Sequence, residues 1–328
     1  MPDQLHPLIA IVLVVLGLVL TITGSDQLVR GAASLARRLG LSSFVIGVTI
    51  VAFGTSAPEL FTSVRASLDG AGGLGVGNVV GSNIANICFI LGVAALFRPI
   101  AASRTIAMRD APIVLGVSLI ATAMMLNQSL SRLEGGALFA GIVAYIWYNL
   151  KAGRPDTPQP PPPESDLEPE NATPPTDRAF VSSLRTTIGL LGLLAGSWLL
   201  VWGSVDLALS MGVSEIVIGA TVIAFGTSVP ELAASIQAAI RKESDIAIGN
   251  ILGSNVFNLL VVLGAAAAAR PIAISSEMLT IHIPAMLVTI AIIIPIIASR
   301  SRIGRIEGGV LVSLYLVYAG YLFISALM

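Results

Sequence analysis

Two glutamates draw attention because each lies inside an apolar stretch beside small side chains that carry oxygen. The first ends the run GTSAPE at Glu59, and the second ends the run GTSVPE at Glu231. Neither run contains a lysine or an arginine. A carboxylate without a basic partner is expensive to hold in an apolar environment. The two runs therefore predict a bound cation beside Glu59 and Glu231.

The residues before each glutamate offer further oxygen ligands. Thr55 and Ser56 lie four and three residues before Glu59, so one helical face presents all three side chains. Pro58 lacks an N–H and its ring crowds the carbonyl four residues earlier, which predicts a kinked or unwound helix. The second run repeats this arrangement with Thr227, Ser228, Pro230 and Glu231.

Unwinding of these helices would also expose backbone oxygens. Carbonyls in the segments that begin at Ala52 and Ala224 would lose helical partners, and lipid offers none in exchange. We expect these carbonyls to face the cation as additional ligands.

A second motif, GSNxxN, follows each glutamate run. It places Ser82 and Asn86 four residues apart in the first copy, and Ser254 and Asn258 in the second. Serine and asparagine within a membrane can either bind an ion or join neighbouring helices. We assign the ion-binding role to these four, and both roles stay open for the intervening Asn83 and Asn255.

The predicted ligand set consists of oxygen atoms alone. Carboxylate, amide, hydroxyl and carbonyl oxygens select hard cations, and calcium accepts six to eight of them in irregular geometry. Two carboxylates neutralise one calcium ion or two monovalent ions. An empty site carrying two negative charges is costly in a membrane, which favours exchange of one ion for another.

Composition identifies the kind of protein that must position these residues. The chain has 328 residues, of which 55% are hydrophobic and 11% are charged. Soluble domains carry about 25% charged residues. The formal net charge of −1 gives no attraction to nucleic acid, and a single cysteine, Cys88, rules out a disulfide within the chain. The composition predicts a multi-pass membrane protein, with the lipid bilayer as its surroundings.

Apolar runs long enough to cross a bilayer predict an all-α membrane protein with ten transmembrane helices. The runs lie near residues 7–29, 43–67, 74–96, 111–129, 133–150, 184–205, 215–239, 246–268, 278–298 and 307–327. Alternate loops hold 15 of the 18 basic residues, and the remaining loops hold Arg65, Arg132 and Arg270. The positive-inside rule places the basic loops in the cytoplasm and both termini outside it.

The two motifs recur at a constant offset of 172 residues, as Glu59 and Glu231 show. Each copy belongs to a half with five predicted spans, and an odd number inverts the second half in the membrane. We predict a first repeat over 1–151, a second over 181–328, and a proline-rich, acidic, disordered cytoplasmic linker over 152–180.

The paired GTSxPE and GSNxxN motifs resemble the repeats of the cation/calcium exchanger superfamily, and most closely those of prokaryotic sodium/calcium antiporters. The resemblance covers nearly the whole chain outside the linker. It implies inverted five-helix repeats and alternating access. It also implies an ion site lined by Glu59, Glu231, Thr55, Thr227, Ser56, Ser228, Ser82, Ser254 and Asn86. It also implies residence in a bacterial or archaeal cell membrane.

Several functions stay open at this stage. The leading hypothesis is an antiporter that exchanges calcium for sodium. Some prokaryotic sodium/calcium members carry aspartate where this chain has Asn258, so a calcium/proton exchanger of the same fold is the alternative. A cation channel is a weaker third hypothesis. We expect no enzymatic activity, no resident cofactor and no obligatory protein partner, because the transported ions account for the predicted site.

Overall fold

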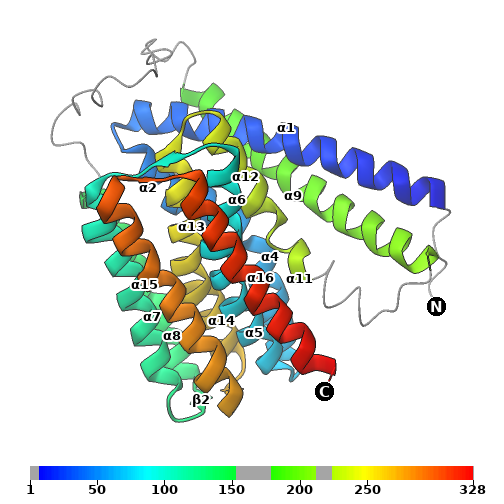
Figure 1. Ribbon diagram of the computed structural model, residues 1–328, viewed down its shortest axis with the longest axis vertical. Coiled ribbons are helices and arrows are strands. Elements are labelled where there is room, and N and C mark those ends of the chain that lie inside the picture. The colour runs from blue at the N-terminus through cyan, green and yellow to red at the C-terminus, as the bar shows by residue number, and fades with distance from the viewer. Residues whose placement is uncertain (1–6, 153–178, 212–223, 328) are drawn as a thin grey trace.

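The chain folds almost entirely into helices (Figure 1). A computed structural model describes residues 7–152, 179–211 and 224–327. The linker between the two predicted halves lies outside these ranges, apart from its first and last helical residues. Residues 212–223 also lie outside them, and they include the first part, 215–223, of the predicted seventh span.

The first half begins with one long helix and continues with shorter helical segments. Its elements are α1 (Pro7–Leu39), α2 (Ser43–Ile46), η1 (Gly47–Val51), α3 (Ala52–Thr55), α4 (Ala57–Leu68), α5 (Gly72–Ile84), η2 (Ala85–Ile90), α6 (Leu91–Phe97), β1 (Ile100–Ala101), η3 (Ile106–Asp110), α7 (Ala111–Met125), β2 (Ser129–Leu130) and α8 (Arg132–Ala152). Segments labelled η are short π-helical stretches that continue the neighbouring α-helices.

The second half repeats this order of elements. It comprises α9 (Ala179–Ser210), α11 (Ala224–Gly226), α12 (Val229–Ile240), α13 (Ser244–Phe257), η5 (Asn258–Val262), α14 (Leu263–Ala269), β3 (Ile272–Ala273), η6 (Met278–His282), α15 (Ile283–Arg300), β4 (Arg302–Ile303) and α16 (Arg305–Leu327). Most bounds follow those of the first half at the offset seen in the sequence. The repeated motifs therefore lie in equivalent elements.

Two antiparallel strand pairs connect the halves at opposite ends of the bundle. Strand β1 pairs with β4, and β2 pairs with β3. Near β1, the backbone N–H of Ala101 donates to Ser244 Oγ, and Arg37 forms an ion pair with Glu243. Burial raises the pKa of the Glu243 carboxyl, although the Arg37 guanidinium acts in the opposite direction. These contacts gather the loops that the sequence marks as basic at one end, here called the arginine-rich end.

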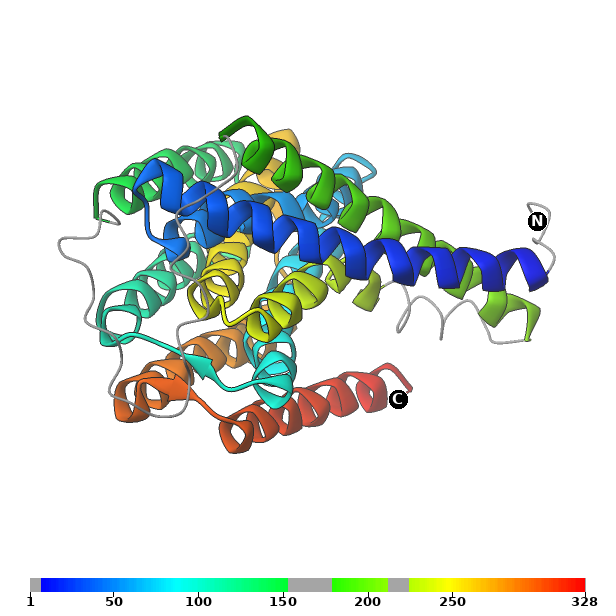
Figure 2. The same cartoon turned by 90° about the horizontal axis from the view of Figure 1, so that it is seen from above.

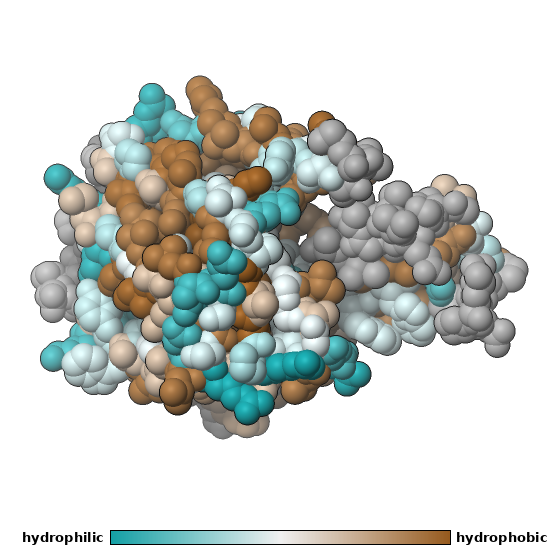
Figure 3. All heavy atoms as spheres, turned by 90° about the horizontal axis from the view of Figure 1, so that it is seen from below, coloured by the Kyte–Doolittle hydropathy of each residue, from teal (hydrophilic) through white to brown (hydrophobic). Residues whose placement is uncertain are grey.

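The opposite end gathers the loops that hold the three remaining arginines. Arg270 donates to the backbone carbonyl of Leu68, and Arg132 donates to that of Ala269. Hydrophilic and hydrophobic residues are mixed on this end of the molecule (Figure 3). The loops rich in basic residues therefore lie at one end of the molecule, and the loops with few basic residues lie at the other end, as the positive-inside rule predicts.

Helices α1 and α9 lie side by side and extend beyond the other helices (Figure 1, Figure 2). They run antiparallel and touch through glycines seven residues apart: Gly17, Gly24 and Gly31 on α1, and Gly189, Gly196 and Gly203 on α9. Ser34 and Ser182 are joined by a hydrogen bond of 2.8 Å between their hydroxyls. Small residues at such positions let two backbones approach closely.

The outward faces of the long helices are apolar. Leu191 and Trp198 on α9, and Leu316 and Val317 on α16, are each at least 60% exposed. By contrast, α13 and α14 run through the centre of the molecule, and an 18-residue stretch of this span is completely buried by the helices around it. An exterior more apolar than a soluble protein tolerates is suited to contact with lipid.

Seven described helices are long and apolar enough to cross a membrane, and an eighth span is obtained if the bent pair from Ser43 to Leu68 is counted as one. The chain is therefore a multi-pass membrane protein. Of the remaining predicted spans, 133–150 corresponds to α8, and 215–239 extends into residues outside the described ranges. The total of ten and the repeat boundaries stay predictions.

Close packing of α1 on α9 makes a specific prediction for glycine substitutions. A methyl group at Gly196 would lie 2.8 Å from the backbone carbon of Leu20, where nothing flexible can move aside. We expect Gly196→Ala to destabilise the protein by about 1–3 kcal/mol, as overpacking does. Gly116→Ala on α7 is the control, because nothing lies within 4 Å of the added methyl. Thermal unfolding in detergent measures both; equal stability of the two variants would contradict this packing.

Candidate cation site

Each glutamate run forms a broken helix, as the proline predicts. Helices α2 to α3 and helix α4 meet at an angle of 48° around Ser56. Ser228 occupies the equivalent break between α11 and α12, with nearly the same backbone angles. In each run the proline is the second residue of the helix after the break, where its missing N–H has no partner to lose. Glu59 and Glu231 therefore lie in the first turns of α4 and α12.

Each half donates a hydrogen bond to the glutamate of the other half. Ser56 donates a hydrogen bond of 2.9 Å to Oε1 of Glu231, and Ser228 donates one of 3.4 Å to Oε1 of Glu59. Each glutamate is 1% exposed, and the two are close enough to interact electrostatically. Repulsion between two buried carboxylates must be offset, and a cation between them would do so.

Four asparagines form a second reciprocal arrangement beside the glutamates. Asn83 donates to the backbone carbonyl of Asn255, and Asn255 donates to that of Asn83. Asn86 donates to Oδ1 of Asn255 at 2.9 Å, and Asn258 donates to Oδ1 of Asn83 at 3.1 Å. The amide nitrogens are thus used in joining the halves. The Oδ1 atoms of Asn86 and Asn258 have no such partner.

Six buried oxygen atoms in this region lack a hydrogen-bond partner among the described residues. They are Glu59 Oε2, Glu231 Oε2, Asn86 Oδ1, Asn258 Oδ1, Thr227 Oγ1 and Ser254 Oγ. Leaving a buried polar atom unpaired costs about 1–3 kcal/mol, and more for a charged group. All six belong to residues predicted from sequence as ion ligands. Their chemistry matches that of a hard cation's ligands.

The other predicted ligands lie in the same elements but differ in their contacts. Thr55 is fully buried and donates to Oδ1 of Asn250. Ser82 is 7% exposed on α5. The Ala52 carbonyl accepts the backbone N–H of Ser56 at 3.1 Å, so the expected freeing of that carbonyl is not seen in this structure. Ala224 is the first residue of α11, and its side chain is not among those described.

Asn250 has a role that the sequence analysis did not assign. Its Nδ2 donates to Ser235 Oγ and to the backbone carbonyl of Glu231, while its Oδ1 accepts from Thr55. Asn78 makes the equivalent bond to Ser63 in the first half. A signal for this role is present in both copies of the repeat, as the asparagine that follows glycine in GNxxG.

The π-helical turns also escaped prediction. Both η2 and η5 include the last asparagine of the GSNxxN motif, Asn86 and Asn258 respectively. The backbone carbonyls of these asparagines accept from the N–H five residues later, at Leu91 and Leu263. Such turns are frequent at functional sites, and periodicity cannot reveal them because they add one residue to an otherwise apolar helix.

Among the described residues, no three acidic, histidine or cysteine side chains gather in one place. The charge of the site therefore comes from the two glutamates, and neutral oxygens supply the rest. This donor set differs from that of zinc, which prefers nitrogen and sulfur ligands.

Comparison with known proteins shows which family this chain resembles. Residues 9–151 and 182–324 each match the family described as sodium/calcium exchanger protein. The antiporter CaxA of Alkalimonas amylolytica is 38% identical over 97% of this chain and 100% of its own length. The sodium/calcium exchanger MaX1 of Methanosarcina acetivorans is 32% identical over 95% of this chain and 97% of its own.

The structure agrees with a solved exchanger as well. The sodium-calcium exchanger NCX_Mj, in a form soaked without Na⁺ and Ca²⁺, superposes with a TM-score of 0.84 at 30% sequence identity. The match covers 97% of this chain and 100% of NCX_Mj. Because the family match includes both halves and these relatives align along nearly the whole length, the chain belongs to the sodium/calcium exchanger family.

Proposed function

We propose that the protein exchanges calcium for sodium across the membrane by alternating access, with Glu59 and Glu231 at the shared ion site. The observation that carries the proposal is the set of unpartnered oxygens at the centre of the molecule, which includes one oxygen of each glutamate. Family membership supports cation antiport in general. The two-glutamate site and the sodium coupling are the proposed refinements.

Charge balance explains why such a site would couple two ions. One calcium ion or two sodium ions neutralise two carboxylates, whereas the empty site leaves two like charges buried together. Moving uncompensated charge through a low-dielectric interior is costly. An empty carrier would therefore change its facing side slowly, and net flux would require a counter-ion.

The halves are joined at the site itself by the two serine–glutamate bonds. A cation that binds both Oε2 atoms would draw on residues from α4, α12 and the four-asparagine arrangement at once. Because the donors come from both halves, ion binding would depend on how the halves are placed relative to each other. We propose that this dependence links ion occupancy to the change of access.

The remaining features of the proposal follow from family and sequence. We place the protein in a cell membrane with ten spans and both termini outside the cytoplasm. It acts as a transporter without enzymatic activity, and the transported ions are its ligands, with no resident cofactor and no obligatory protein partner. The arginine-rich end faces the cytoplasm in this scheme.

Proton coupling is a second candidate, favoured by one observation. Asn86 and Asn258 are both neutral amides, so the candidate ligands among the described residues include two titratable groups, Glu59 and Glu231. Two glutamates could release two protons when calcium binds. This mechanism would use the same carboxylates with a different counter-ion.

Neutral substitution of either glutamate tests the site. Glu59→Gln or Glu231→Gln keeps the side-chain shape but removes one charge, and loss of one partner in a buried charged set costs about 3–5 kcal/mol. We expect calcium uptake into proteoliposomes to fall by roughly 100-fold or more. Calcium should also cease to raise the melting temperature.

The matched control is Glu134→Gln, at the start of α8, where the carboxylate accepts from the backbone N–H and hydroxyl of Ser131. This variant should transport calcium normally. Either site variant retaining calcium transport at the level of Glu134→Gln would remove that glutamate from the site.

Imposed gradients separate the two coupling ions. Proteoliposomes loaded with sodium, with pH equal on both sides, should take up calcium when diluted into sodium-free buffer. A pH gradient of equal driving force, without sodium, should drive little uptake. The reverse pattern would establish proton coupling and reject sodium. Uptake that ignores both gradients would indicate a passive pathway and contradict both antiport mechanisms.

A further inference from the structure

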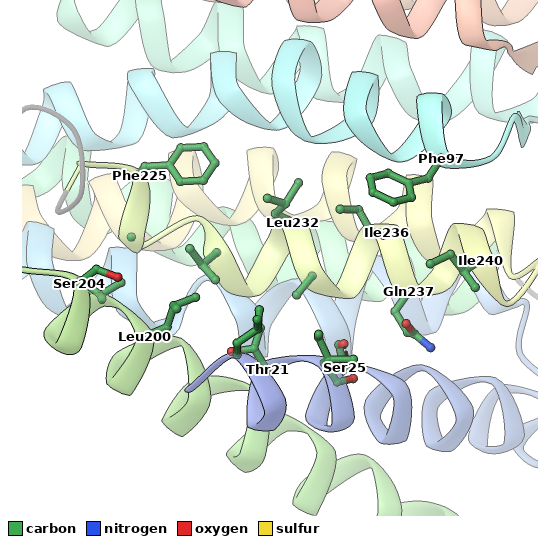
Figure 4. A pocket seen from close by; sticks show the side chains of 16 residues that line it. Thr21, Ser25, Phe97, Leu200, Ser204, Phe225, Leu232, Ile236, Gln237 and Ile240 are labelled. Carbon is green, nitrogen blue, oxygen red and sulfur yellow. Dashed lines mark hydrogen bonds between the residues drawn. The ribbon is translucent and has the colours of Figure 1, made fainter. Parts of the chain in front are cut away.

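A large apolar cavity lies between the α1/α9 pair and helices α6, α11 and α12 (Figure 4). Its volume is about 850 Å³. Leu18 and Ile22 of α1, Leu200 and Val201 of α9, and Leu232 and Ile236 of α12 contribute to its walls. Phe225 and Phe97 lie toward its two ends. None of the described residues that line the cavity is charged, so it is poorly suited to conduct cations.

Helix α12 turns opposite faces to the cavity and to the cation site. Cavity residues recur along it at helical spacing, from Val229 to Ile240. Glu231 and Ser235 point elsewhere and bond to Ser56 and Asn250 respectively. The stretch from Val229 to Ile240 is about 16 Å long. One leaflet of a bilayer has a hydrocarbon thickness of about 15 Å, so the cavity is matched to an acyl chain.

A second pocket opens directly beside the apolar cavity, at the arginine-rich end. It has a volume of about 520 Å³ and is lined by Phe97, Arg98, Pro99, Ile240, Arg302 and Arg305. Phe97 and Ile240 line both spaces. The pairing of β1 with β4 sets Arg302 beside Ala101. It thereby brings Arg302 close to Arg98, which lies just before β1. The apolar cavity thus adjoins a pocket that contains Arg98, Arg302 and Arg305, here called the basic mouth of the cavity.

The three arginines of this mouth form no ion pair within the described part of the chain. Arg98 and Arg305 donate to the backbone carbonyls of Ile240 and Leu96, at 3.4 and 3.2 Å. The nearby Glu307 is bonded to Arg300 and to the backbone N–H of Gly304. Arginine forks suit phosphate oxygens. The mouth therefore has the charge that a lipid phosphate requires.

We propose that these two spaces form a binding site for an anionic phospholipid of the leaflet at the arginine-rich end. The phosphate lies among Arg98, Arg302 and Arg305, and one acyl chain fills the cavity between the α1/α9 pair and α12. The bound lipid fixes the spacing of that pair from the helix that carries Glu231. This assignment does not depend on which ion drives calcium exchange.

The other half of the protein supplies an internal comparison. Arg132 begins α8 and donates to the backbone carbonyl of Ala269, as Arg305 begins α16 and donates to that of Leu96. Strand β2 has Ser129 in the position that Arg302 occupies in β4. On α4, Phe61 is 76% exposed, whereas its counterpart Ala233 lines the cavity. The opposite end therefore has one arginine fewer.

Lipid retention on the purified, delipidated protein tests the proposal. Native mass spectrometry with dioleoylphosphatidylglycerol should show one retained lipid per chain, bound roughly 10-fold or more tightly than dioleoylphosphatidylcholine. Arg305→Gln and Arg302→Gln should each weaken phosphatidylglycerol binding several-fold. Ala233→Phe, which fills the cavity, should also weaken it. Arg132→Gln should leave it unchanged.

Several results would overturn the site. Equal binding of the two lipids would remove the role of the arginines. Equal loss in Arg132→Gln and Arg305→Gln would reduce the effect to general surface charge. Glycerol 3-phosphate competing as well as the intact lipid would leave a soluble-anion site without an acyl chain. Calcium-dependent thermal stabilisation confirms folding of each variant, and Arg302→Gln, whose side chain makes no hydrogen bond to another described residue, carries the test if Ala233→Phe is unstable.

Discussion

Repulsion between two buried carboxylates is the constraint on which the rest of this structure depends. Glu59 and Glu231 are almost completely shielded from solvent, and serine hydroxyls provide them with one hydrogen bond each. Hydroxyl donors do not neutralise charge. In the proposed function a bound cation would offset this repulsion and its release would restore it, which is the condition a carrier needs in order to exchange ions.

The candidate site is built from equivalent elements of the two repeated halves. Three kinds of hydrogen bond around it have a counterpart in the other half: serine with glutamate, asparagine with asparagine, and the Asn78–Ser63 bond with the Asn250–Ser235 bond. The bond from Thr55 to Asn250 differs, because the equivalent Thr227 hydroxyl has no partner among the described residues. Because the partners cross between halves, neither half can form the site alone. The same crossing places two broken helices against each other, so their breaks face one another rather than lipid.

The halves are alike in their contacts but differ in their surroundings. Asp26 of α1 accepts from Gln237 and Arg241 at the end of α12, at 2.6 and 2.7 Å. In the first half, the corresponding face of α4 leaves Phe61 and Leu68 exposed. The α1/α9 pair thus contacts α12 of the second half at the arginine-rich end.

Much of the site could be predicted because its elements obey local rules. Pro58 and Pro230 lack the N–H that would continue a helix, and a carboxylate in an apolar run has few explanations. The offset of 172 residues then predicted that the two runs belong together. What periodicity could not supply were contacts between segments far apart in sequence. The crossed bonds of Ser56 and Ser228, the role of Asn250 and the π-helical turns all depend on tertiary packing.

The bounds of elements were harder to predict than their existence. The first span was expected over 7–29, yet α1 continues to Leu39 because Asp26 and Arg30 pair with each other and Asp26 also pairs with Arg241. Because these charged side chains are paired with each other, α1 can continue through them without leaving an unpaired charge in lipid. The cavity behind α12 was not foreseen, since the residues around it come from five separate helices.

The most direct measurement is the position of calcium in the protein. Crystals soaked in calcium, with data collected at a long wavelength for the anomalous signal of the ion, locate it independently of any transport assay. The account predicts one dominant peak between the carboxylates, about 2.3–2.6 Å from an oxygen of both Glu59 and Glu231. Calcium bound elsewhere, with these two carboxylates unoccupied, would contradict it.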